Sequence, residues 1–151
     1  MKTILQRVSR AAVRVDGREV GSIGLGVLLL VGVGRGDTEA DADATVRKIA
    51  GLRVFPGRTP MDRTLAEVEG ACLVVSQFTL LGTVKKGNRP GFDRAAEPGI
   101  AEQLYERVAD GLHMAGIPVA TGVFGASMEV ELVNLGPVTL RIETEEGRVL
   151  P

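Results

Sequence analysis

The alternation of apolar and polar positions predicts that the chain begins with β structure. Residues 4–8 and 13–15 alternate in the way that is typical of half-buried strands. Asp16-Gly17 is a hairpin turn signal, and residues 20–23 are the expected returning strand. The run 27–31 is apolar at every position, which predicts a central strand buried on both faces.

Two later segments predict helices. The first has Asp37 or Thr38 as its cap and extends to about Ala50. The second lies between Pro98 and Gly116, and its apolar residues recur with a period of about 3.6. Proline suits the first turn of a helix and glycine suits the position after the last turn, so these two residues predict where the second helix begins and ends.

The remaining segments complete a mixed α/β (α+β) pattern. Further strands are expected at residues 52–55, 71–78, 119–123, 128–133 and 138–142, with exposed polar loops at 58–70 and 83–93. We therefore expect a single domain, 1–151, in which curved β-sheets form a barrel-like layered structure. The two main helices are expected to pack on one side of it.

Composition narrows the classes of function. The chain has 44% hydrophobic and 25% charged residues, which excludes disorder over its whole length. Its net charge of −1 means that any nucleic-acid binding must come from a local patch. With 3% aromatic residues, platforms for stacking single-stranded bases are scarce. The start of the chain does not match a secretory signal, and no apolar run could span a membrane, so a cytoplasmic location is expected.

The single cysteine and the single histidine limit the chemistry further. Cys72 lies in an apolar run, where a core thiol is the expected role, and one thiol excludes a disulfide framework. His113 lies near the end of the second predicted helix, where we interpret it as a surface or capping residue. We therefore expect no metal and no cofactor.

Three segments carry candidate chemistry. Ser76-Gln77-Phe78-Thr79 ends a buried strand, where polar side chains serve either a site or ordinary strand-end hydrogen bonding. In the segment 134–139, between two predicted strands, Gly136-Pro137 interrupts a β pattern, which is typical either of a plain turn or of a rigid feature, such as one with a cis bond. Residues 85–94 contain four cations and one carboxylate, a net charge of +3, which fits phosphate binding or a solvated face.

The candidate nucleophiles Ser76, Thr79 and Thr139 have no evident base nearby in sequence. The pair Glu129 and Glu131 shares one face of a predicted strand and is interpreted as exposed. A Ser-His-Asp hydrolase and a paired-carboxylate mechanism are therefore both poorly supported.

Taken together, these segments resemble the D-aminoacyl-tRNA deacylase family over nearly the whole chain. The most specific stretches are Val74–Leu80 and Gly136–Thr139, two motifs in the right order and about 57 residues apart. Weaker similarity extends through Gln6-Arg7-Val8, Lys86-Gly87-Asn88-Arg89-Pro90, Phe124-Gly125-Ala126 and Leu132-Val133-Asn134.

The resemblance implies a homodimeric enzyme that hydrolyses the ester between a D-amino acid and the 3′-terminal adenosine of tRNA, and that also removes glycine. Ser76-Gln77-Phe78-Thr79 would form the floor of the pocket. Gly136-Pro137, with a cis bond, would reach into the partner's pocket and hold the substrate ammonium with its carbonyls. An L side chain would then strike the main chain, whereas glycine has no side chain to reject.

The same resemblance implies further roles. The amides of Phe78 and Thr79 would stabilise the oxyanion while the ribose 2′-hydroxyl assists attack by water, with Thr79 as a covalent nucleophile as the rival mechanism. Phe124 and Met128 are assigned to the adenosine or aminoacyl pocket, and Thr139, which ends the second motif, to substrate binding. Lys85, Lys86 and Arg89 are assigned to the phosphates of the acceptor stem.

Two departures from the family pattern stand out. Leu135 precedes the Gly-Pro pair where many relatives have an acidic residue, and residues 60–65 differ from the usual Met-Asn-Leu pattern. The alternative interpretation is a non-catalytic tRNA-binding module, which would need the positively charged residues 85–94, called the basic loop below. It does not need Thr79 or Gly136-Pro137, and the presence of both favours the enzyme.

Overall fold

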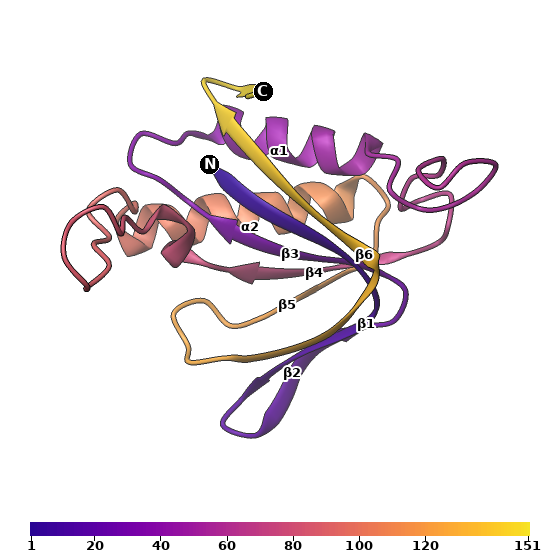
Figure 1. Ribbon diagram of the computed structural model, residues 1–151, viewed down its shortest axis with the longest axis horizontal. Helices are drawn as coiled ribbons and strands as arrows, with labels where there is room; N and C mark the ends of the chain where they lie inside the picture. Colours follow the sequence, from indigo (N-terminus) through magenta and orange to yellow (C-terminus); the bar gives the residue numbers. More distant parts are fainter.

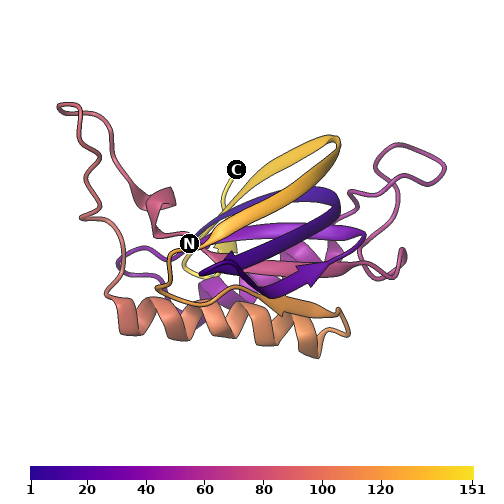
Figure 2. The same ribbon diagram turned by 90° about the horizontal axis from the view of Figure 1, so that it is seen from below.

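The computed structural model describes residues 1–151 as a seven-stranded sheet covered by two helices (Figure 1). The strands are β1 (Lys2–Val15), β2 (Arg18–Ile23), β3 (Gly26–Gly32), β4 (Ala71–Ser76), β5 (Val119–Thr121), β6 (Glu129–Glu145) and β7 (Arg148–Val149). The helices are α1 (Glu39–Gly51), the short 3-10 helix η1 (Phe78–Leu81) and α2 (Pro98–Met114). Both long helices lie on the same face of the sheet, as Figure 2 shows, which confirms the predicted mixed class and the packing on one side.

β1 is the strand around which the sheet is organised. Its residues Lys2–Val8 pair with β3, its residues Ala11–Val15 pair with β2, and β6 follows its other edge along most of its length. The strand order is β5-β4-β3-β1-β6-β7, with β3, β4 and β5 parallel to one another and β1 antiparallel to its neighbours. Asp16 and Gly17 join β1 to β2 with φ values of 50° and 75°, which confirms the predicted hairpin turn.

Because β1 changes partner from β3 to β2, the sheet curls until β2 lies beside β5. The approach is close: a Cβ added at Gly21 would lie 2.4 Å from the carbonyl oxygen of Thr121. Only glycine fits a strand position where another backbone comes so near. The structure is thus a single half-barrel sheet, which corrects the prediction of several curved sheets.

The core has two parts, one on each face of β3 and β4. On the helix side, Val27, Leu29 and Val74 pack against the helices. On the inner side of the curl, Leu28 and Leu73 belong to a smaller cluster. The prediction that β3 is buried on both faces is confirmed. No helix has the length and apolar character needed to cross a bilayer.

Five of the predicted strand segments have different boundaries in the structure. The two segments expected at 128–133 and 138–142 form one strand, β6, and those at 4–8 and 13–15 form one strand, β1. The strand expected at 71–78 ends at Ser76, because η1 follows it. Both helices lie where they were predicted.

The strand expected at residues 52–55 is absent. Phe55 makes only an isolated bridge with Arg63, with N–H to oxygen distances of 3.1 and 2.9 Å. The side chains of Val54 and Phe55 are buried in the helix-side core, so the apolar pattern reflects burial rather than strand pairing. Pro56 follows directly and lacks the N–H that a continuing ladder would need.

Asp41 ties α1 to the turn between β6 and β7. Its carboxylate accepts hydrogen bonds from the Gly147 N–H (2.9 Å) and from the N–H and hydroxyl of Thr38, the cap of α1 (2.8 and 3.0 Å). Burial by itself would raise the pKa of Asp41, but these hydrogen bonds together hold it below the usual value. The ionised carboxylate therefore contributes to the stability of the fold.

We predict that Asp41→Asn lowers the free energy of unfolding by about 1–3 kcal/mol at neutral pH, because buried donors lose a charged acceptor. The folded pKa of Asp41 lies below the unfolded value of about 3.9, so the contribution is present above that value and is lost as the pH falls through the folded pKa. Urea unfolding between pH 7 and pH 2 measures it. Asp43→Asn on the same helix, which removes an exposed ion pair with Arg107, is the control and should cost much less. Equal losses in the two variants would contradict this role of Asp41.

Candidate active site

The Ser76–Thr79 stretch lies where β4 ends and η1 begins. Gln77 continues the pairing beyond the strand, since its N–H donates to the Val31 carbonyl at 2.7 Å. Leu80 donates the first 3-10 hydrogen bond, to the Gln77 carbonyl at 3.2 Å. The amides of Phe78 and Thr79 precede that bond, so they have no acceptor within η1. Two neighbouring N–H groups at a strand end can stabilise a negative charge that develops beside them.

A mostly apolar cavity of about 320 Å³ opens beside this stretch. It is lined by Val31, Val33, Ser76, Gln77, Phe78, Ala95, Ala96, Pro98, Ala101, Tyr105, Phe124 and Gly125. Of the residues assigned to substrate binding by resemblance, Phe124 is part of this lining. Met128 is not: it packs against the inner cluster of the curled sheet and beside Gly122. Within one chain, Met128 therefore does not share a pocket with Phe124.

The cavity contains no side chain that can act as a base at neutral pH. Tyr105 is its one ionisable residue; burial raises the pKa of Tyr105 to about 12, and its hydroxyl donates to the Val74 carbonyl at 2.9 Å. His113 is exposed in the last turn of α2, about 12 Å along the helix from Tyr105. Burial also raises the pKa of the Cys72 thiol to about 12, which confirms a core cysteine.

Thr79 is exposed, and its hydroxyl accepts a hydrogen bond from the side-chain amide of Gln77. An amide N–H cannot take a proton from a hydroxyl, so the contact does not activate Thr79 as a nucleophile. Phe78 is 57% exposed and meets Phe92 edge-on, with ring centroids 5.0 Å apart. The Phe78–Phe92 contact attaches the base of the following loop to η1.

That loop carries the three predicted phosphate-binding cations. Reciprocal hydrogen bonds of 2.8 and 2.9 Å between Thr83 and Gly91 close its base, and the loop projects from the body of the molecule (Figure 2). Lys85, Lys86 and Arg89 are exposed and make no ion pair. The structure thus places an unpaired positive surface next to the η1 cavity.

Gly136-Pro137 is neither a plain turn nor the boundary between two strands. The peptide bond is cis, and the pair lies inside β6. Residues Gln6 and Val8 of β1 pair with Thr139 and Asn134, so three extra residues of β6 leave the ladder at this point. We call residues 135–138 the β6 bulge; Gly136 and Pro137 are exposed on it.

Two side chains hold the β6 bulge in place. Asn134 closes it: its Oδ1 accepts the Val138 N–H at 2.8 Å, and its Nδ2 donates to the Thr139 hydroxyl at 2.9 Å. Arg7 holds it from β1, donating to the Leu135 carbonyl at 3.0 Å and to the Val54 carbonyl at 2.6 Å. The bulge is thus anchored at Leu135 through the main chain, so an acidic side chain there is not needed for this contact.

In one chain, the Ser76–Thr79 stretch and the β6 bulge lie at opposite ends of β3 and β4. Ser76 pairs with Val31 of β3, which in turn pairs with Thr3 of β1, whereas the bulge lies opposite Arg7 of β1. Four residues of β1 correspond to about 13 Å along the strand. Gly136 instead borders a separate hollow of about 490 Å³ with Arg7, Phe55 and Leu135. The two predicted halves of the site therefore do not meet within a single chain.

Comparisons with known proteins identify the family of this chain. The family model described as D-Tyr-tRNA(Tyr) deacylase matches residues 4–143. A D-aminoacyl-tRNA deacylase of Geobacter sulfurreducens is 52% identical over 146 residues, covering 96% of each chain. One from Symbiobacterium thermophilum is 53% identical, with 97% of each chain covered. The chain belongs to the D-aminoacyl-tRNA deacylase family. The resemblance inferred from the sequence is confirmed, and the members of this family are ester hydrolases.

Solved structures agree with this fold. A protein named c-Myc DNA unwinding element binding protein matches with a TM-score of 0.89 and 37% identity, covering 96% of this chain and 99% of its own. A probable eukaryotic D-amino acid tRNA deacylase matches with a TM-score of 0.79 at 19% identity, a likeness of fold alone. No group of three or more His, Cys, Asp or Glu side chains in this deacylase family member is arranged to hold a metal ion.

Sequence reasoning assigned no role to Arg7 or to Asn134, although Asn134 begins the candidate segment 134–139. Both lie in stretches that resemble the family, but a cation and an amide in strands give no local sign of what they bind. Only the β1–β6 register reveals that they face the β6 bulge.

We predict that Gly136→Ala lowers the free energy of unfolding by about 1–3 kcal/mol. Gly136 has a φ of +123°, and an added Cβ would lie 2.7 Å from the Arg7 guanidinium. Gly24→Ala is the matched control, because nothing lies within 4 Å of its added Cβ and its φ is not positive. The stability of both variants is measured from the midpoints of their urea unfolding curves, provided that the slope of the free energy of unfolding against urea concentration is unchanged. If Gly136→Ala is as stable as Gly24→Ala, the β6 bulge is not held as described.

Proposed function

We propose that this protein hydrolyses the ester bond of D-aminoacyl-tRNA, releasing the D-amino acid and tRNA, and that it also deacylates glycyl-tRNA. The observation that carries the proposal is the survival of both family motifs, each exposed and each in a defined geometry, in a chain about half identical to deacylases along its whole length. The reaction is a chiral proofreading step in translation.

The complete site, on this proposal, is built by two copies of the chain. The η1 cavity has no carboxylate that could bind an ammonium, whereas the β6 bulge presents exposed main chain at Gly136 and Pro137. These parts lie about 13 Å apart along the strands of one chain. A two-fold dimer can bring the bulge of each copy to the cavity of the other, which gives two equivalent sites.

The chemistry needs few protein groups. An aminoacyl ester is already activated, and the ribose of the terminal adenosine carries a neighbouring 2′-hydroxyl that can assist attack by water. The amides of Phe78 and Thr79 would donate to the developing oxyanion, while Gln77 fixes the Thr79 hydroxyl. The lack of any base with a suitable pKa in the cavity supports RNA-assisted attack over a covalent Thr79 intermediate.

Selection against L-amino acids would come from the β6 bulge. Its main chain is fixed at both ends, by Asn134 and by Arg7, so its carbonyls can hold the substrate ammonium at one point. With the ammonium and the ester both placed, the α-hydrogen and the side chain have one allowed arrangement. An L side chain would strike the main chain of Gly136, whereas glycine would be accepted.

The surroundings of the site fit an RNA substrate. Phe124 and Tyr105 face the cavity with ring centroids 5.9 Å apart and offer an apolar wall for the terminal adenosine. Lys85, Lys86 and Arg89 stand on the projecting loop, where they can contact the phosphates of the acceptor stem without reading sequence. Recognition would then rest on shape and backbone charge.

A non-catalytic nucleic-acid-binding module is the competing function. The protein named c-Myc DNA unwinding element binding protein has the same fold, and its name describes DNA binding. Such a module would use the basic loop. It would have no use for the β6 bulge that Arg7 and Asn134 hold in place, and this bulge favours the enzyme.

The test is deacylation of matched D- and L-aminoacyl-tRNA that carry the same amino acid. We expect the D-ester to be lost at least about a hundredfold faster than the L-ester, because an L side chain meets main chain that cannot move aside. Spontaneous hydrolysis without protein is the baseline for both. Equal rates for the two esters, or binding of tRNA without cleavage, would overturn the proposed function.

We predict that Thr79→Ala keeps measurable hydrolysis, with a loss of no more than about tenfold, since the Thr79 amide remains when its hydroxyl is removed. Single-turnover rates with D-aminoacyl-tRNA measure the effect. Thr83→Ala, an exposed threonine at the base of the basic loop, is the control. Complete loss in a folded Thr79→Ala protein, with Thr83→Ala unaffected, would instead indicate a covalent mechanism.

A further inference from the structure

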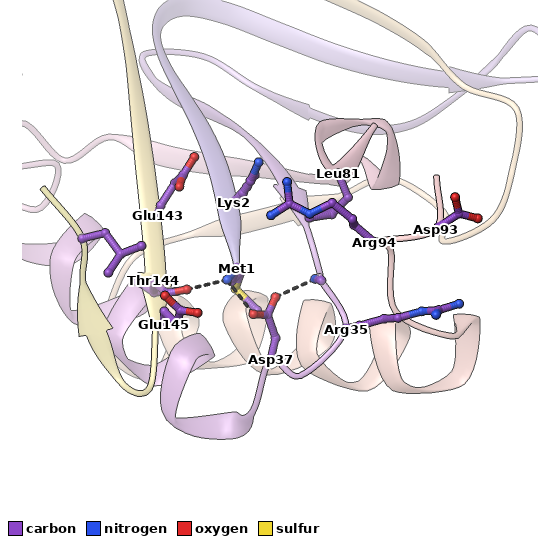
Figure 3. A pocket seen from close by; sticks show the side chains of 12 residues that line it. Met1, Lys2, Arg35, Asp37, Leu81, Asp93, Arg94, Glu143, Thr144 and Glu145 are labelled. Atoms are coloured by element: carbon purple, nitrogen blue, oxygen red, sulfur yellow. Dashed lines mark hydrogen bonds and ion pairs between the residues drawn. The ribbon is translucent and has the colours of Figure 1, made fainter. Parts of the chain in front are cut away.

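A second hollow, of about 310 Å³, lies beside the η1 cavity (Figure 3). Its floor is made by Met1, Gly34, Asp37 and Thr144, where the Met1 amine bonds to the Asp37 carboxylate at 2.7 Å. Its rim includes Lys2 from β1 and Arg94 from the segment before α2. Nothing in the site described so far uses this hollow.

Two cations of the hollow converge without a partner. In Figure 3, the side chains of Lys2 and Arg94 point toward one another across its mouth. Neither makes an ion pair or a side-chain hydrogen bond with any group of the protein. An anion that contacts both side chains would offset the repulsion between them.

Four carboxylates line the hollow, those of Asp37, Asp93, Glu143 and Glu145, and none of them is paired with Lys2 or Arg94. Asp37 is bonded to the Met1 amine, and its other oxygen accepts the Gly34 N–H at 2.6 Å. Glu143 lies directly opposite Lys2 in the β1–β6 ladder, but its carboxylate is bonded to Arg141 at 2.9 Å. Asp93 points away, on the far side of the Arg94 backbone (Figure 3). The place between Lys2 and Arg94 is therefore open to an external anion.

The hollow and the η1 cavity share their dividing wall. Val33 and Ala95 line the cavity, while their chain neighbours Gly34 and Arg94 line the hollow. Hydrogen bonds from the Arg35 N–H to the Arg94 carbonyl (2.9 Å) and from the Ala96 N–H to the Val33 carbonyl (3.0 Å) join the two segments of the wall. η1 also borders both spaces, through Phe78 and Leu81, and its four residues span about 8 Å.

We propose that Lys2 and Arg94 form a phosphate subsite for the RNA strand whose terminal adenosine occupies the η1 cavity. The inference rests on the proposed function, and it adds the part of the substrate that this face holds: a phosphodiester on the 5′ side of the terminal adenosine. Two cations on separate segments fix the direction in which the strand leaves the cavity. The loop cations Lys85, Lys86 and Arg89 then contact phosphates farther along the RNA.

The test is equilibrium binding of short ligands, which does not depend on catalysis. The trinucleotide CCA, adenosine and inorganic phosphate are titrated by NMR into the wild type and into the double variant Lys2→Gln/Arg94→Gln. We expect the wild type to bind CCA at least about tenfold more tightly than adenosine, and the double variant to lose about tenfold in CCA affinity with adenosine unchanged. The single variant Arg94→Gln changes an exposed side chain without hydrogen bonds, and it should show part of the same loss in CCA affinity.

Two controls separate the subsite from general charge. Lys2→Arg/Arg94→Lys should bind CCA as the wild type does. Lys85→Gln/Lys86→Gln/Arg89→Gln should weaken binding of whole tRNA and should reduce CCA affinity far less than the Lys2/Arg94 double variant does, because on this proposal the loop contacts phosphates farther along the RNA. Unchanged CCA affinity in the double variant overturns the subsite, as does inorganic phosphate binding as tightly as CCA, which would indicate a site for free anions.

Failure of the subsite and failure of the proposed function give different results. If the wild type cleaves D-aminoacyl-tRNA but the double variant binds CCA normally, only the subsite is wrong. If CCA binding depends on Lys2 and Arg94 but no ester is cleaved, the subsite stands and the enzymatic function is wrong.

Discussion

The pairing of β1 with β6 is the interaction on which the rest of the structure depends. β6 follows β1 along most of its length, while the other edge of β1 passes from β3 to β2, and this change of partner curls the sheet. One ladder therefore fixes the half-barrel and also fixes where the three extra residues of the β6 bulge must leave it. Arg7 and Asn134, one on each strand, hold the bulge at that point.

The same ladder separates the two halves of the candidate site. β4 runs beside β3 to its end at Ser76, so the free amides of η1 lie at the other end of β3 and β4 from the β6 bulge. What each half offers is largely main chain: amides at η1 and carbonyls at the bulge. A site made of main chain changes little with side-chain substitution, and it suits a reaction whose substrate supplies both an activated ester and a neighbouring hydroxyl.

Much of this could be predicted from local sequence signals. The uniform apolarity of β3, the capping residues of α1 and α2, and the Asp16-Gly17 turn each act within a few residues, and each prediction is confirmed. Predictions that depended on distant partners were less successful. The β6 bulge was expected to lie between two strands, because the partner strand that carries β6 past it cannot be seen in the local pattern. Val54 and Phe55 suggested a strand, although they are buried by helices rather than by pairing. Within one chain, Met128 packs against the inner cluster and does not line the η1 cavity with Phe124, since alternation along a strand does not say which cavity a face meets.

The central claim is that each site takes its cavity from one copy and its β6 bulge from another, and a mixed-dimer experiment tests it most directly. One variant, Ala95→Trp, fills the η1 cavity; the other, Gly136→Ala, disturbs the bulge. Each alone should be inactive toward D-aminoacyl-tRNA. Co-expression should restore about a quarter of the wild-type activity, because half of the dimers are mixed and each mixed dimer has one intact site. The two proteins combined without subunit exchange should stay inactive. No recovery in verified mixed dimers would mean that cavity and bulge act within one chain, or not together, and would contradict the account.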